Sequence, residues 1–200
     1  MKGFYYILLI PFIWACSKEN SLTVNLNSLS NSLVPSFSDS IQYRSSKGDT
    51  ISLFPISSSK YYEKQSGSYD QGGSLGDLDY LEEQRAEFLI GNVKKNIQLK
   101  WKLSANYQNQ RPMFSRDAFS IFQIDTNGQS LEFFTAEIQD SLICELQNQK
   151  CNRLDSLRIE NTSYLRVFHN ESQAPRAYIS PSNGLIKFID KDSVVFELIP

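Results

Sequence analysis

The sequence contains few of the side chains that bind transition metals. Of its 200 residues, only three are Cys and one is His. A structural zinc site usually takes four such ligands, so these residues are too few to form one. The acidic residues between positions 70 and 83 lack the regular spacing of a calcium loop. We therefore expect no metal site and no cofactor.

Catalytic motifs and an excess of charge are also absent. There is no Gly-x-Ser-x-Gly elbow around a nucleophilic serine and no glycine-rich loop for phosphates. The 20 basic and 22 acidic residues nearly balance, and no basic patch stands out. We expect a non-catalytic protein that does not bind nucleic acid.

The chain has no apolar run long enough to cross a bilayer. Residues 3–15 carry no charged side chain, follow the single charge of Lys2 and include Pro11. A membrane-spanning helix needs about 20 apolar residues, whereas the apolar region of a signal peptide needs about 7–15. Residues 1–15 are therefore predicted to be a signal peptide.

The end of this segment suggests how the protein is anchored. Ile13-Trp14-Ala15-Cys16 resembles the lipobox of bacterial lipoproteins. This resemblance implies cleavage before Cys16, a diacylglycerol on its thiol and an acyl group on the new amine. Several acyl chains would hold the protein stably on a membrane. The alternatives are an ordinary cleaved signal with an incidental cysteine, or an uncleaved anchor.

The four residues after Cys16 bear on the membrane to which the protein goes. Ser17-Lys18-Glu19-Asn20 has no Asp beside the cysteine and so differs from the inner-membrane retention signal of such lipoproteins. A Lys next to an acidic residue resembles the export signal of some surface lipoproteins. We expect a lipid-anchored protein of the outer membrane, on either its periplasmic or its cell-surface face.

Residues 16–36 form a Ser- and Asn-rich segment that we expect to be a flexible tether, because it offers little apolar surface to bury. Its scattered aliphatic residues leave open that it docks as a short strand or turn; they are Leu22, Val24, Leu26, Leu29 and Leu33. Residues 37–200 are predicted to be a single domain.

Short strands separated by turns dominate that domain. In residues 97–103, apolar side chains alternate with polar ones, which puts them on one face of a strand. Asn127-Gly128 predicts a hairpin between residues 118–125 and 131–138. The pattern favours a mainly β fold, an antiparallel sandwich or a partly open barrel. Two short helices are possible, one capped by Asp77 and one over residues 141–150.

The second of these helices competes with a disulfide between Cys144 and Cys151. On a helix the two residues would be ~10.5 Å apart along the axis, too far to bridge. In a hairpin around residues 146–150 they could lie opposite one another. An exported protein with two remaining cysteines favours the hairpin and the disulfide.

Two regions are candidates for function. Residues 61–80 combine Gly and Ser with Tyr61, Tyr62, Tyr69 and Tyr80, a mixture typical of binding loops. Such a loop could contact an apolar or glycan ligand or an envelope protein, although it could also be a mobile insertion with no partner. The alternative hypothesis is an envelope hydrolase or other enzyme that uses His169, which requires a nearby acid or nucleophile.

A local pattern of Asp, a hydroxyl residue and an aliphatic residue occurs five times. It is typical of a turn that leads into a strand, and it also resembles the O-glycosylation sequon of certain outer-membrane bacteria. The five copies are Asp39-Ser40-Ile41, Asp49-Thr50-Ile51, Asp140-Ser141-Leu142, Asp155-Ser156-Leu157 and Asp192-Ser193-Val194.

Overall fold

The computed structural model describes residues 21–34, 40–69, 78–106, 116–125, 127–139, 141–143, 145–146, 149–170 and 175–200. Most of them lie in strands. The elements in chain order are β1 (Ser21–Val24), α1 (Ser28–Ser32), β2 (Ile41–Ser45), β3 (Thr50–Tyr69), β4 (Leu78–Asn92), the 3-10 turn η1 (Val93–Lys95), β5 (Ile97–Asn106), β6 (Arg116–Ile124), β7 (Ser130–Gln139), β8 (Ser141–Ile143), β9 (Glu145–Leu146), β10 (Gln149–Ile159), β11 (Thr162–Asn170), β12 (Arg176–Ser180), β13 (Gly184–Ile189) and β14 (Val195–Leu198).

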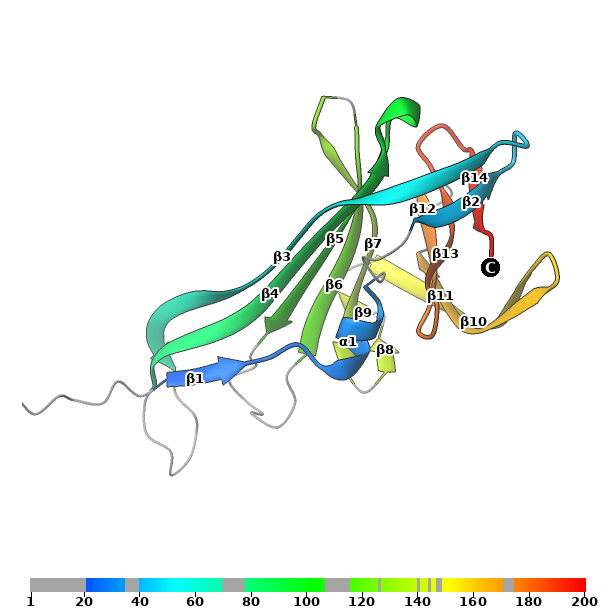
Figure 1. The fold of residues 1–200 in the computed structure, drawn as a ribbon. Coiled ribbons are helices and arrows are strands. Elements are labelled where there is room, and N and C mark those ends of the chain that lie inside the picture. The colour runs from blue at the N-terminus through cyan, green and yellow to red at the C-terminus, as the bar shows by residue number, and fades with distance from the viewer. Residues whose placement is uncertain are drawn as a thin grey trace, which may run out of the picture.

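The strands form one antiparallel path that almost closes on itself (Figure 1). From β2 to β8, and again from β9 to β14, each strand pairs with the next one in the chain. β14 also pairs with β2, which joins the two runs. The path begins at β8 and ends at β9, which are neighbours in the sequence. This confirms the predicted mainly β fold, and of its two forms the structure is the partly open barrel.

Local patterns placed several strands correctly. The alternation in residues 97–103 corresponds to β5, whose Leu99, Trp101 and Leu103 are buried. The predicted Asn127-Gly128 hairpin joins β6 to β7, and Gly128 has a φ of 78°. Glycine suits that left-handed conformation because it has no Cβ to clash with the backbone.

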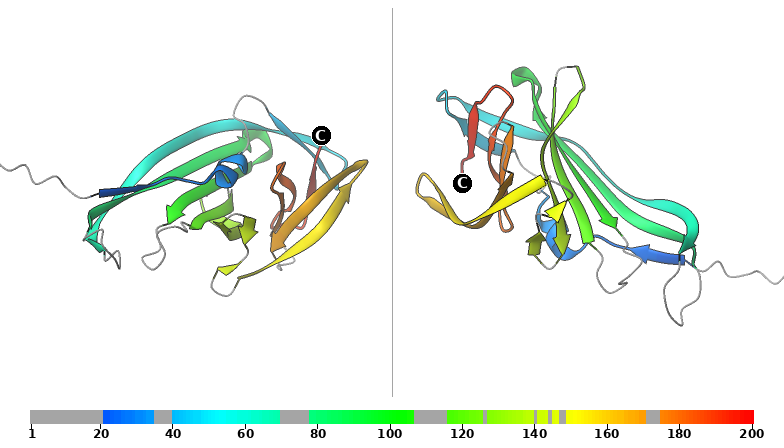
Figure 2. Two further views of the ribbon diagram at one scale, coloured as in Figure 1. Left: turned by 90° about the horizontal axis from the view of Figure 1, so that it is seen from below. Right: turned by 180° about the vertical axis from the view of Figure 1, so that it is seen from behind.

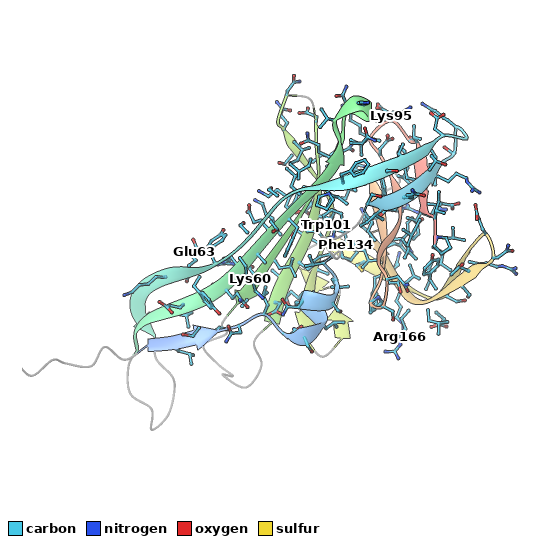
Figure 3. All side chains as sticks on the ribbon, viewed as in Figure 1. Lys60, Glu63, Lys95, Trp101, Phe134 and Arg166 are labelled. Atoms are coloured by element: carbon cyan, nitrogen blue, oxygen red, sulfur yellow. The ribbon has the colours of Figure 1, made fainter. Side chains whose placement is uncertain are left out.

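Aromatic side chains fill the space between the two runs of strands. Figures 1 and 2 show the curved β3–β7 sheet facing β10–β14, and Trp101 and Phe134 point between them in Figure 3. Phe133 on β7 and Phe188 on β13 have ring centroids 6.1 Å apart, and Phe188 also stacks on Phe196 at 4.6 Å. Such large buried rings dominate the burial of apolar surface in a core of this size.

The N-terminal segment differs from the flexible tether that we expected. β1 pairs in parallel with β4, and Leu26 and Leu33 are buried in the core. Polar contacts hold the same segment. The buried carboxylate of Asp117 on β6 accepts hydrogen bonds from the backbone N–H of Asn27, at 2.7 Å, and from the Ser30 hydroxyl. Docking as a strand and a turn, the alternative left open by the sequence, is therefore correct for residues 21–34.

Both possible helices are strands instead. The residues expected to follow a cap at Asp77 form β4, which takes backbone hydrogen bonds from β3 and β5 on its two sides. The residues described between 141 and 150 belong to β8, β9 and β10. In both places, pairing with the neighbouring strands outweighs a weak local preference for helix. Among the described residues, no helix has the length and apolar character needed to cross a membrane.

Candidate functional site

Four hairpin turns meet at one end of the barrel and surround a pocket of about 370 Å³. They are the turns between β2 and β3, β4 and β5, β6 and β7, and β13 and β14. Figure 3 marks this end of the molecule by Lys95, in the β4–β5 turn. We call this cavity the rim pocket. It is lined by Ser45, Lys47, Asp49, Ile51, Lys95, Asn96, Ile97, Gln123, Asp125, Asp190, Lys191, Asp192, Val194 and Phe196.

Two of these turns have the same construction, each built on an aspartate. Oδ1 of Asp125 accepts the backbone N–H groups of the residues two and four positions later, at 2.9 and 2.7 Å. Oδ1 of Asp190 does the same at 2.9 and 2.8 Å. In each turn the residue three positions after the aspartate, Gly128 or Ser193, has a positive φ. Local hydrogen bonds of this kind fix the shape of both turns.

The β2–β3 turn repeats this scheme with a serine in place of the aspartate. The Ser45 hydroxyl accepts the backbone N–H of Lys47 at 3.2 Å, and Gly48 takes the positive φ of 90°. In the β4–β5 turn Oδ1 of Asn92 accepts the backbone N–H of Lys95 at 3.1 Å, so all four turns around the rim pocket are held by their own side chains. Their lining residues occupy positions that do not depend on a ligand.

The floor of the rim pocket is apolar. Ile51, Ile97, Val194 and Phe196 line it, and each is at most 8% exposed. They come from β3, β5, β14 and the residue just before β14, so opposite sides of the barrel meet beneath the pocket. An apolar floor with a few polar groups above it is the usual composition of a small-molecule site.

Gln123 on β6 is the unusual polar residue of this pocket. Its side chain is only 7% exposed, and its buried Oε1 has no hydrogen-bond partner in the described structure. A buried polar atom of this kind destabilises a fold by about 1–3 kcal/mol when it stays unpaired. Its position in the pocket wall means that a ligand could supply the missing partner.

Charges of both signs surround the opening. Nζ of Lys95 lies 3.6 Å from Oδ2 of Asp49, and this exposed ion pair contributes little to stability. Within the described residues, Lys47 and Lys191 make no ion pair, and the second carboxylate oxygens of Asp125 and Asp190 accept no hydrogen bond. Groups of three or more His, Cys, Asp or Glu arranged to hold a metal ion do not occur in the same part of the chain.

The tyrosines expected in a binding loop lie elsewhere. Tyr61 and Tyr62 are consecutive residues of β3, so they face opposite sides of the sheet, and the loop interpretation is wrong for them. The Tyr62 hydroxyl donates to Oδ1 of Asn25 at 2.7 Å, which links β3 to the N-terminal segment. Tyr69 and Tyr80 lie in β3 and β4, with Tyr69 opposite Leu78. A binding role for these four tyrosines stays a prediction.

His169 lies on β11, and its ring stacks on Tyr178 with centroids 5.1 Å apart. Its Nδ1 is 2.9 Å from the backbone oxygen of Asn170. Among the described residues, no carboxylate or hydroxyl is hydrogen-bonded to this ring. Residues 171–174, which follow this strand, lie outside the described residues, so the enzyme hypothesis stays a prediction.

The cysteine predictions fall mainly on residues that the structure does not describe. Cys16 and Cys144 both lie outside the described residues. The hairpin predicted around Cys144 and Cys151 is confirmed, because Leu146 pairs with Gln149 and Glu145 with Lys150. The disulfide itself stays a prediction.

The rim pocket was not predicted from the sequence. One signal could have indicated Gln123: it follows Phe119 and Ile121 at a spacing of two and therefore faces inward with them. Comparison with family models, with curated proteins and with solved structures found no match to this chain.

Proposed function

We propose that the chain is a lipid-anchored, non-catalytic binding protein of the bacterial outer envelope, with the rim pocket as its ligand site. The signal segment and the lipobox-like residues before Cys16 support the anchor and the outer-membrane location. The unpaired amide of Gln123 supports the binding role. A protein that keeps a destabilising polar group beside a preformed pocket has a functional reason to do so.

The anchor is tested by lipid labelling. Cells that express the full chain are grown with a labelled fatty acid, and Cys16→Ala is compared with the wild type. We expect the label to be lost in Cys16→Ala and retained in the control variant Ser17→Ala, because only the cysteine thiol accepts the diacylglycerol. A Cys16→Ala protein that remains labelled and membrane-bound contradicts the proposal.

The binding role is tested with small molecules from envelope extract. The full chain is incubated with extract, freed of unbound material and analysed by native mass spectrometry. We expect a mass increment on the wild type that is absent from Gln123→Met, which removes the amide at nearly constant volume. Gln129→Met is the matched control, because its side chain is exposed and outside the pocket. Equal retention by wild type and Gln123→Met would show that the pocket is not the site.

The proposal includes a disulfide between Cys144 and Cys151. In the β9–β10 hairpin, residue 146 pairs with 149 and residue 145 with 150. If this register continues by one residue, residue 144 pairs with residue 151. Directly opposite residues of an antiparallel pair have Cβ atoms close enough for a bridge. Mass analysis without reductant should find these two cysteines linked, whereas two freely alkylated thiols in native protein would contradict the bridge.

A further inference from the structure

We infer that the ligand of the rim pocket is a short peptide with an apolar side chain. The inference rests on the proposed function, because it names the class of ligand for the same site. It follows from three properties of the pocket: the unpaired amide in its wall, the nature of its apolar floor, and the free charges of both signs at its opening.

The amide of Gln123 is the first property. Its Oε1 is buried and has no hydrogen-bond partner within the described residues. A side-chain amide offers an acceptor and a donor side by side. A peptide group offers the complementary donor and acceptor, so one peptide unit of a ligand can satisfy both atoms of Gln123.

The floor is the second property, and it distinguishes a peptide from a sugar. Sugars commonly stack on an open aromatic ring, but Phe196 is only 4% exposed and its ring already stacks on Phe188 at 4.6 Å. The rest of the floor is aliphatic, namely Ile51, Ile97 and Val194. Aliphatic side chains pack best against an apolar side chain, and burial of that side chain would favour binding.

The free charges are the third property. The ammonium groups of Lys47 and Lys191 lack ion-pair partners in the described structure, as do the second carboxylate oxygens of Asp125 and Asp190. A short peptide carries an ammonium at one end and a carboxylate at the other, so it can use both sets. The pocket volume of about 370 Å³ lies near the lower end of ligand sites, which limits the ligand to a few residues.

Isothermal titration of the full chain in detergent tests this inference with leucyl-leucine as the probe. We expect binding at one site. We expect N-acetylation and C-terminal amidation of the probe each to raise Kd about tenfold, because each removes one charge-assisted contact. Maltose is the competing probe, and it should not bind.

Two variants connect the binding to the pocket. Gln123→Met should raise Kd for leucyl-leucine about tenfold, as expected when one hydrogen-bonded polar group is lost, while Gln129→Met should leave it unchanged. Gln129→Met should unfold at the wild-type temperature, whereas Gln123→Met should unfold at a higher one, because it removes a buried oxygen that has no hydrogen-bond partner within the described residues. If Gln123→Met fails to fold, the capped peptides on wild-type protein decide the question.

The peptide inference is overturned if leucyl-leucine does not bind, if maltose binds in its place, or if capping the peptide leaves Kd unchanged. This failure is distinct from failure of the proposed function. A compound from envelope extract that needs Gln123 while leucyl-leucine does not bind preserves the binding role and rejects the peptide. If neither leucyl-leucine nor a compound from envelope extract binds through Gln123, both the peptide inference and the binding role are rejected.

Discussion

Two regions of the molecule are held by aspartates that accept hydrogen bonds: the turn-lined end of the barrel and the docked N-terminal segment. The two regions differ in how far apart the bonded residues lie in the sequence. Asp190 binds residues two and four positions later. Asp117 binds Asn27 and Ser30, which lie 90 and 87 positions earlier. The Asp190 bonds need only one turn to form. The Asp117 bonds need β6 and the N-terminal segment to be already in place.

The docking of the N-terminal segment has a cost at Asp117. Asp117 is fully buried, and its Oδ1 has no partner in the described structure. Burial raises the pKa of its carboxyl above the ordinary value, although the hydrogen bonds from Ser30 and Asn27 act in the opposite direction. Asp190 is also buried, at 7% exposed, but its two hydrogen bonds come from its own turn. Both aspartates are therefore largely removed from water, and only Asp117 depends on a distant segment for its hydrogen bonds.

The largest effect is expected from Asp117→Ala. The substitution leaves the Asn27 N–H and the Ser30 hydroxyl without their shared acceptor, and it opens a small cavity. We expect the free energy of unfolding to fall by about 3 kcal/mol, measured by urea denaturation of the full chain. A loss below about 1 kcal/mol would mean that the N-terminal segment docks without this carboxylate.

The burial of Asp117 predicts a pH dependence of stability. Because its folded pKa is raised, the folded state holds this proton at pH values where the unfolded chain, with an ordinary value of 3.8, has released it. Its contribution to stability is therefore greatest below 3.8 and is lost as pH rises through the folded pKa. Unfolding of the wild type and Asp117→Asn, followed from pH 3 upward, should show wild-type stability falling relative to the variant. A constant difference would contradict the raised pKa.

A smaller loss is expected from Asp190→Ala. The change removes the acceptor of two backbone N–H groups, and one of the two hydrogen bonds is part-buried and the other buried. We expect the free energy of unfolding to fall by about 1.5 kcal/mol. The docking of residues 21–34 should be unchanged. A proteolysis assay should find the N-terminal segment as protected as in the wild type. Release of that segment would show that the two regions are coupled.

The smallest effect is expected from Asp125→Ala. Its turn has the same hydrogen bonds as the Asp190 turn, but they are exposed, so water can replace the lost acceptor. We expect a loss of about 0.5 kcal/mol by the same denaturation. An effect as large as that of Asp190→Ala would show that burial does not separate the two turns.

Several turns and strands could be predicted from short patterns. Asp49-Thr50-Ile51 and Asp192-Ser193-Val194 do lead from turns into β3 and β14. The same pattern at Asp155-Ser156-Leu157 lies within β10, so the turn interpretation is wrong there. β11 pairs with β10 along this stretch, and the pairing outweighs the local preference for a turn.

The sequence by itself determined strands with clear alternation, such as β5, and hairpins with clear turn residues, such as β6–β7, because both patterns act through neighbours only a few positions away. Only the tertiary structure decided the roles of Asp117 and Gln123. Both lie on β6 at the spacing of the buried Phe119 and Ile121, so the pattern could show that they face inward. What each meets there depends on segments far away in the chain. Asp117 meets the docked residues Asn27 and Ser30, whereas Gln123 meets a pocket formed by four separate turns.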